Sequence, residues 1–189
     1  MRVLILPEDQ HNDQYIVKPV LESLFNDLGK PARVDVLPEP RLRGSTDALD
    51  KDLIAQIVAD NAAMVDIFVL IVDRDCGRES NAERAAAIES KHSDRLIACA
   101  AIEEVETWLL ALHRSEVESR AKLRWSEVRA HCDPKEAFAI PLLESLGSNG
   151  PGAGRKAAMR ALKGQWRTLL SLCGELADLR NRIESMLQG

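Results

Sequence analysis

The chain has 189 residues, of which 46% are hydrophobic, and a net charge of −5, so it can bury a single sizeable core. No apolar run approaches the roughly 20 residues of a membrane helix, and the N-terminal MRVLILPED turns acidic too early for a signal peptide. We therefore expect a cytoplasmic protein with no membrane partner. The four cysteines contain no CxxC pair, which argues against a zinc site and against a disulfide framework.

Charge is distributed unevenly along the chain. Residues 1–113 hold 12 Lys/Arg and 21 Asp/Glu, whereas residues 114–189 hold 13 and 9. An acidic half beside a mildly basic half is compatible with a cation site next to a phosphate-binding face. It is equally compatible with surface charge that has no function.

The first 113 residues alternate short apolar segments with helical patterns. Strands are predicted at residues 2–6, 33–37, 67–72 and 95–101. The third of these, IFVLIV, is almost wholly apolar, as expected of a strand covered on both faces. The helices between them follow from apolar residues at three- and four-residue spacing.

This alternation predicts an α/β fold with a parallel sheet of about four strands, flanked by helices and joined by right-handed crossovers. Residues 114–189 predict a helical extension that packs on this domain. A glycine-rich segment, GSNGPGAGRK at 147–156, separates the helices of the extension.

Acidic residues follow three of the four predicted strands. Glu8 follows the first, Asp73 and Asp75 follow the third, and a cluster at 103–106 follows the fourth. The carboxyl ends of parallel strands lie at one edge of a sheet, so these carboxylates should converge there. Converging carboxylates repel one another unless they are protonated or bridged by a cation, and hard oxygen ligands select Mg²⁺ or Mn²⁺.

The spacing within each cluster refines this prediction. Asp73 and Asp75 are two positions apart on a strand end, so both face the same way, and Arg74 faces away. A helix through the later cluster places Glu103 and Glu106 on one side and Glu104 on the other. Two alternatives remain open: the aspartates as turn and cap residues, and the glutamates as the acidic first turn of a helix.

The arrangement resembles a TOPRIM domain, the fold of topoisomerases, bacterial primases and OLD-type nucleases. EDQHNDQYIVKPVLESL resembles the family opening and VDRDC matches its DxD motif. ETWLLAL and DPKEAF are similar to segments of small stand-alone TOPRIM-like proteins related to OLD and RloB-type nucleases. The likeness covers about residues 1–140. This chain departs from the family pattern by having Asp9 where Gly usually follows the first Glu, and it has no GxxxxGK[ST] ATPase motif.

The resemblance implies a Mg²⁺-dependent nuclease that cleaves nucleic-acid phosphodiesters, with protein partners in DNA repair or phage defence. It assigns metal binding and the general-base role to Glu8, metal binding to Asp73 and Asp75, and a further acidic role to Glu106. Because the expected helix places Glu103 on the same side as Glu106, we predict that both glutamates join the metal ligands. Basic side chains are expected to hold the phosphate backbone, namely Arg41, Arg43, Arg155 and Lys156.

Two other functions fit the same residues. A non-catalytic TOPRIM-like binding or regulatory module would explain the acidic net charge and the missing glycine. A haloacid-dehalogenase-like phosphatase would use Asp73 as a nucleophile and Asp75 as acid and base. Proteins of that class carry DxD after their first strand, whereas here it follows the third.

Overall fold

The structure, a computed structural model, describes residues 1–76, 79–147 and 150–188. Its centre is a four-stranded sheet in the order β2-β1-β3-β4, in which every neighbouring pair is parallel. The strands are β1 (Arg2–Pro7), β2 (Arg33–Val36), β3 (Ile67–Asp73) and β4 (Leu96–Ala101). The predicted parallel α/β sheet is confirmed, and its strands begin and end within one residue of the predicted positions.

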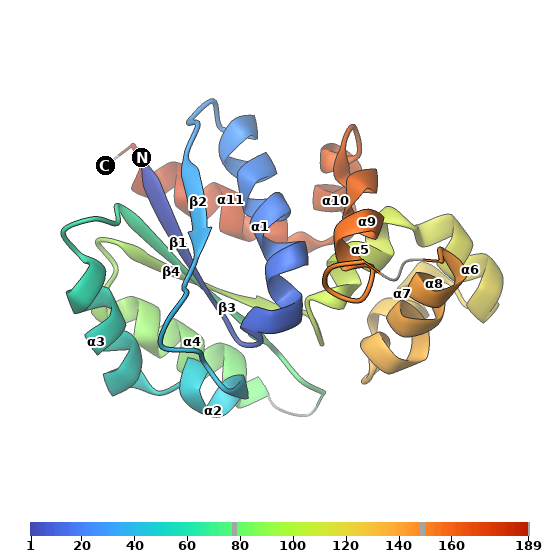
Figure 1. The fold of residues 1–189 in the computed structure, drawn as a ribbon, viewed down its shortest axis with the longest axis horizontal. Helices are drawn as coiled ribbons and strands as arrows, with labels where there is room; N and C mark the ends of the chain where they lie inside the picture. The colour runs from blue at the N-terminus through green and yellow to red at the C-terminus, as the bar shows by residue number, and fades with distance from the viewer. Residues whose placement is uncertain (77–78, 148–149, 189) are drawn as a thin grey trace.

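Helices cover both faces of the sheet (Figure 1). One face carries α1 (Gln10–Asp27) and α11 (Gly174–Met186), and α5 (Glu106–Leu112) continues the same core beyond the strand ends. The other carries α2 (Gly44–Ala48), α3 (Lys51–Asn61) and α4 (Glu79–Lys91).

Strand residues alternate between two hydrophobic cores. In β1, Val3 and Ile5 face α1, whereas Leu4 and Leu6 face the α3 side. In β3, Ile71 and its neighbours alternate in the same way. A strand with apolar partners on both faces needs an unbroken apolar sequence, which is why IFVLIV forms the centre of the sheet.

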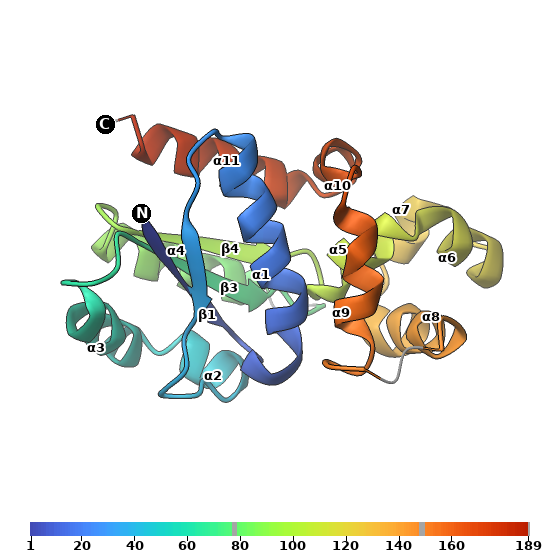
Figure 2. The same cartoon turned by 45° about the horizontal axis from the view of Figure 1, so that its top comes forward.

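The remaining helices form the predicted C-terminal extension. They are α6 (Arg114–Ala121), α7 (Trp125–Arg129), the π-helical η1 (Lys135–Ala139), α8 (Ile140–Ser145), α9 (Arg155–Ala158), the 3₁₀ turn η2 (Met159–Leu162) and α10 (Trp166–Leu172). In both views α6, α7 and α8 lie away from the sheet, while α9 stands beside α1 (Figures 1 and 2).

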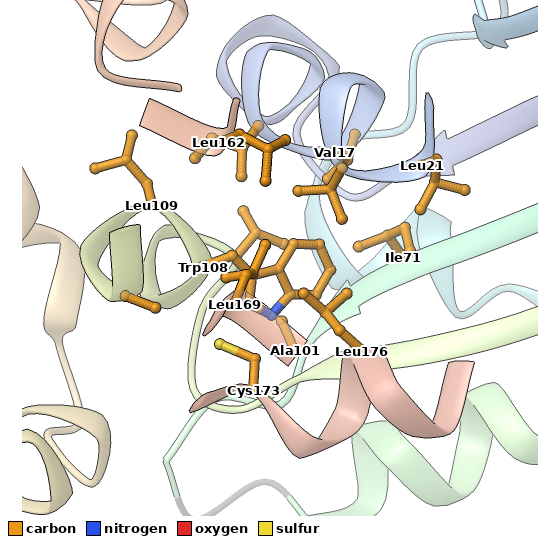
Figure 3. Close-up of a cluster of buried hydrophobic side chains, with 14 of the residues drawn as sticks. Val17, Leu21, Ile71, Ala101, Trp108, Leu109, Leu162, Leu169, Cys173 and Leu176 are labelled. Atoms are coloured by element: carbon orange, nitrogen blue, oxygen red, sulfur yellow. The ribbon is translucent and has the colours of Figure 1, made fainter. Parts of the chain in front are cut away.

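The extension shares one core with the sheet. Trp108 of α5 is fully buried and lies among side chains from α1, η2, α10 and α11 (Figure 3). Val17, Leu162 and Leu176 all belong to this cluster. Residues 114–189 are therefore tied to the sheet through a continuous apolar contact.

The cysteine prediction was wrong in one respect. Cys76, directly after Asp75, is bonded to Cys132, which precedes η1. The two residues are 56 positions apart, with Cα atoms 4.9 Å apart, so their spacing in the sequence gave no signal of the pairing. Cys99 and Cys173 are buried free thiols. No helix in the described part of the chain is both long and apolar enough to cross a membrane.

Candidate functional site

The strand order creates a switch point between β1 and β3. From β1 the chain moves outward to β2, then returns to β3 on the other side of β1 and continues to β4. Ligands of open α/β sheets bind outside the carboxyl ends of the strands where the winding reverses in this way. Glu8 follows β1 and Asp73 ends β3, so both lie at this point.

Backbone hydrogen bonds hold the two acidic residues together. The Glu8 N–H donates to Ile71 O at 3.1 Å, and the Asp73 N–H donates to Glu8 Oε2 at 3.1 Å. Asp73 Oδ1 in turn accepts the Val105 N–H at 2.9 Å, just before α5. Asp73 is therefore oriented by the segments that follow β1 and β4.

Asp75 lies beside this pair. Its backbone has a positive φ of 54°, and its N–H donates to Glu103 O at 3.2 Å. The Asn81 side-chain amide donates to Asp73 O at 3.3 Å and to Asp75 Oδ2 at 3.4 Å. The amide of α4 thus ties both aspartates of the DxD motif to one helix.

A further carboxylate, Asp13, joins this group and was not predicted from the sequence. It lies in the first turn of α1, which Asp9 caps by accepting the His11 N–H at 2.8 Å. Asp13 is only 4% exposed, and its Oδ2 accepts the Asp9 N–H at 3.1 Å. The signal was available, because Asp13 precedes Ile16, Val17 and Val20 at helical spacing and so belongs to the buried stripe.

Burial and mutual repulsion disfavour the charged forms of these groups. Burial raises the pKa of Asp13 to about 8, and the negative charges of Glu106 and Asp9 add to the effect. Burial also raises the pKa of Asp73 well above its usual value, with Asp13, Glu8 and Glu106 contributing in the same direction. Five carboxylates from three segments therefore act on one another electrostatically.

The raised pKa of Asp13 predicts a pH-dependent stability. The unfolded chain releases this proton near pH 3.8, whereas the folded chain retains it up to about pH 8. Between these values the folded state binds more protons, so its free energy of unfolding falls by about 1 kcal/mol per pH unit as the pH rises. We expect Asp13→Asn to flatten this decline, measured by urea unfolding between about pH 5 and about pH 8 without divalent metal.

Asp52→Asn, in the exposed first turn of α3, is the matched control and should leave the slope unchanged. Some slope should persist in Asp13→Asn, because the pKa of Asp73 is also raised and that of Glu104 is raised to about 7, both mainly by burial, and both groups contribute with the same sign. Equal slopes in wild type and Asp13→Asn would contradict the prediction.

Glu106 is held by a buried arginine from the glycine-rich segment. Glu106 and Arg155 are 1% and 3% exposed, and Arg155 Nε and Nη2 both donate to Glu106 Oε1, at 3.2 and 2.5 Å. Arg155 Nη1 donates to Gly152 O at 3.2 Å. Gly152 has a φ of 65°, and a Cβ there would lie 2.2 Å from the Tyr15 ring, so the segment packs against α1 only because this position is glycine.

Arg155 was predicted to bind phosphate, and the structure places it elsewhere. Its guanidinium is engaged inside the protein by Glu106 and Gly152. Its neighbour Lys156 is exposed on α9. The two consecutive basic residues thus have opposite environments.

The helical phase predicted for the cluster at 103–106 was wrong. α5 begins at Glu106, and Glu103 precedes it with a φ of 60°. Glu103 is 3% exposed and forms an ion pair with Arg74, so Glu103 and Glu106 have different basic partners. Arg74, predicted to face away from the aspartates, is the partner in this ion pair.

Glu104 links the site to the extension. Its Oε2 accepts the Lys135 N–H at 2.8 Å, at the start of η1. Burial lowers the pKa of Lys135, but the charges of Glu106 and Glu104 outweigh it, and the net shift is upward. Lys135 is thus a second cation beside the carboxylates that was not predicted from the sequence.

Arg41 and Arg43, predicted to bind nucleic acid, lie in the loop before α2, where Arg43 forms an isolated antiparallel bridge with Asp9. Both are exposed and line a pocket of about 640 Å³ together with His11. The Gly44 N–H donates to Glu8 O at 3.3 Å, which joins this loop to the end of β1. Arg41 Nε lies 3.4 Å from Glu39 Oε1 at the surface.

The donor chemistry at the switch point suits a hard cation, because every acidic ligand offers oxygen. Within the described ranges, however, no three His, Cys, Asp or Glu side chains are gathered closely enough to hold a metal ion. Metal binding would therefore draw the side chains of Glu8, Asp73 and Asp75 closer together than they lie in the structure.

Comparisons of the chain with protein-family models, curated proteins and solved structures find no match.

Proposed function

We propose that the protein is a TOPRIM-like, Mg²⁺- or Mn²⁺-dependent nuclease. The observation that carries the proposal is the partly buried Asp73 at the switch point, whose pKa is raised by desolvation and by the charges of Asp13, Glu8 and Glu106. A divalent cation relieves such repulsion, and strongly perturbed carboxylates in a crevice are typical of functional sites. An acidic cluster with a purely structural role has no reason to lie at the switch point of the sheet. Ligand sites of open α/β sheets, in contrast, occur at that point.

Glu8, Asp73 and Asp75 would hold the metal. A bound Mg²⁺ supplies an activated water and neutralises charge on the phosphate. Glu8 would accept a proton from that water. Glu106 would remain with Arg155, so its role would be to add negative charge beside Asp73 rather than to bind the metal directly.

Arg41 and Arg43 would bind the sugar-phosphate backbone. They lie in the loop that is bonded to Glu8, so a strand held by them would pass the carboxyl ends of β1 and β3. Lys156, exposed on α9, would contribute from the side of the extension. Phosphate contacts of this kind carry most of the affinity of nucleic-acid binding and weaken with salt.

The test is cleavage of single- and double-stranded DNA and RNA by the full chain with Mg²⁺ or Mn²⁺. We expect cleavage of at least one substrate, complete loss of cleavage with EDTA, and recovery when the metal is restored. Glu22→Gln, which removes an exposed carboxylate from α1, should cleave like wild type. Failure to cleave any of these substrates with either metal, or cleavage that persists in EDTA, would refute the proposal.

A non-catalytic binding module is the second candidate. It is favoured by the separation of the carboxylates, which form no closed group of three in the described ranges. Titration calorimetry separates the two candidates, since the nuclease requires Mg²⁺ or Mn²⁺ binding that Asp73→Asn weakens. Binding of nucleic acid without any metal binding would favour the module.

A further inference from the structure

The two edges of the sheet differ in how their backbone groups are used. At the β4 edge, the Ala98 N–H donates to Glu89 Oε2 at 2.9 Å, and Ala98 O accepts from Arg182 Nη2 at 2.7 Å. Arg182 Nη1 also donates to both Glu89 oxygens. Side chains from α4 and α11 therefore occupy both outward hydrogen-bonding groups of Ala98 in the middle of β4, and charged groups so placed oppose the pairing of another strand there.

The β2 edge has no such cover. The N–H groups of Arg33 and Leu37 donate inward, to Met1 O and Ile5 O, both at 2.9 Å. Because alternate residues of a strand face alternate sides, Val34 and Val36 direct their N–H and C=O groups outward. In the described part of the chain no side chain or backbone group is bonded to them, and no helix lies over this edge in either view (Figures 1 and 2).

A groove of about 540 Å³ runs beside this edge. It is lined from both layers, by Lys18 of α1, by Asp35 and Val36 of β2, and by Met64 after α3. Met64 is 57% exposed, the highest value among the large apolar side chains described. The Val34 side chain packs under α1. A strand that docks in the groove would therefore contact the β2 backbone, once the flexible side chains that border the groove move aside.

The sequence of β2 is complementary to itself. Arg33 and Asp35 lie on one face of the strand, where Arg33 Nε and Asp35 Oδ2 are 2.9 Å apart. In an antiparallel pair centred on Val34, the outward groups of Val34 bond to those of Val34 of the partner subunit. Arg33 then lies opposite Asp35 of the partner subunit, in the closely spaced, non-hydrogen-bonded position.

We propose that two copies of this chain pair through β2 about a two-fold axis. The two four-stranded sheets then form one continuous sheet that ends at β4 on each side. Because both β4 edges are capped by Glu89 and Arg182, no further copy can add, and the assembly closes as a dimer rather than growing into a fibre.

Sedimentation equilibrium over a range of protein concentrations tests the pairing. Wild type should be a dimer in exchange with monomer. Arg33→Asp places like charges opposite each other twice in the dimer and should raise the dissociation constant by about tenfold or more. Adding Asp35→Arg to the same chain restores opposite charges and should restore the dimer.

Val36→Pro is an independent variant, because it removes an outward N–H and leaves the bonds to β1 intact. It should also favour the monomer, while far-UV circular dichroism stays like wild type. Arg124→Asp, which breaks an exposed ion pair with Glu127 on α7, is the charge control and should dimerise normally. A wild type that stays monomeric, or a dimer that Arg33→Asp and Val36→Pro both leave unchanged, would overturn the proposal.

Discussion

We expect Asp73→Asn to abolish the proposed hydrolysis and, at the same time, to stabilise the metal-free protein. Loss of groups that merely support metal ligands costs about 10- to 100-fold in activity, so loss of a ligand should cost at least about 100-fold. Stability should rise at about pH 8, because burial and three neighbouring carboxylates disfavour a charged Asp73 and asparagine carries no charge. The amide oxygen can still accept the Val105 N–H.

The opposed signs make this a sharp experiment. Cleavage rates with Mn²⁺ and urea unfolding with EDTA are measured on the same preparations of wild type, Asp73→Asn and the exposed control Glu22→Gln. A variant that loses activity because it is misfolded would lose stability as well. Activity that survives Asp73→Asn, or a metal-free variant less stable than wild type, would contradict the role assigned to Asp73.

The sheet was predictable because its strands are buried on both faces. Such strands need nearly unbroken apolar runs, and the intervening helices need a period near 3.6, so both patterns are visible locally. The start of α1 was less visible. Its polar first turn, Gln10 to Asp13, lacks the apolar stripe, and the helix begins there because Asp9 caps it.

The acidic edge was predictable from the parallel topology of the sheet, but the basic residue that pairs with it was not. Glu8 and Asp73 follow strands of one parallel sheet, and their meeting requires no knowledge of the loops. Arg155 reaches Glu106 across 49 positions of sequence through a glycine segment packed on Tyr15. A positive φ at Glu103 delays the start of α5 until Glu106, which no local periodicity reveals.

Arg155 also shows how the extension contributes to the site. The shared core fixes α9 and η2 against α1, and this contact carries the guanidinium to Glu106. Without it, Glu106, a buried carboxylate that adds to the repulsion on Asp73 and Asp13, would lose its hydrogen-bonded cation and keep only the more distant charge of Lys135. The C-terminal helices therefore support the sheet both through apolar packing and by neutralising one member of its acidic edge.

Removing that arginine should produce the largest loss of stability among the variants considered. Arg155→Met leaves Glu106, which is 1% exposed, without its cation and should lower the free energy of unfolding by about 3–5 kcal/mol. Arg114→Met is the matched control, because it breaks an exposed i,i+4 pair with Glu118 and should cost only about 0.3–0.5 kcal/mol. Urea unfolding at fixed pH measures both.

The double variant Arg155→Met, Glu106→Gln decides why Arg155 matters. If the cost arises from an uncompensated charge, removing the carboxylate should recover much of the lost stability, since replacing a whole buried pair costs far less than breaking it. If Arg155 acted mainly by packing its aliphatic stem, methionine would already replace it and the single variant would be nearly neutral. A double variant no more stable than Arg155→Met would contradict the ion-pair role.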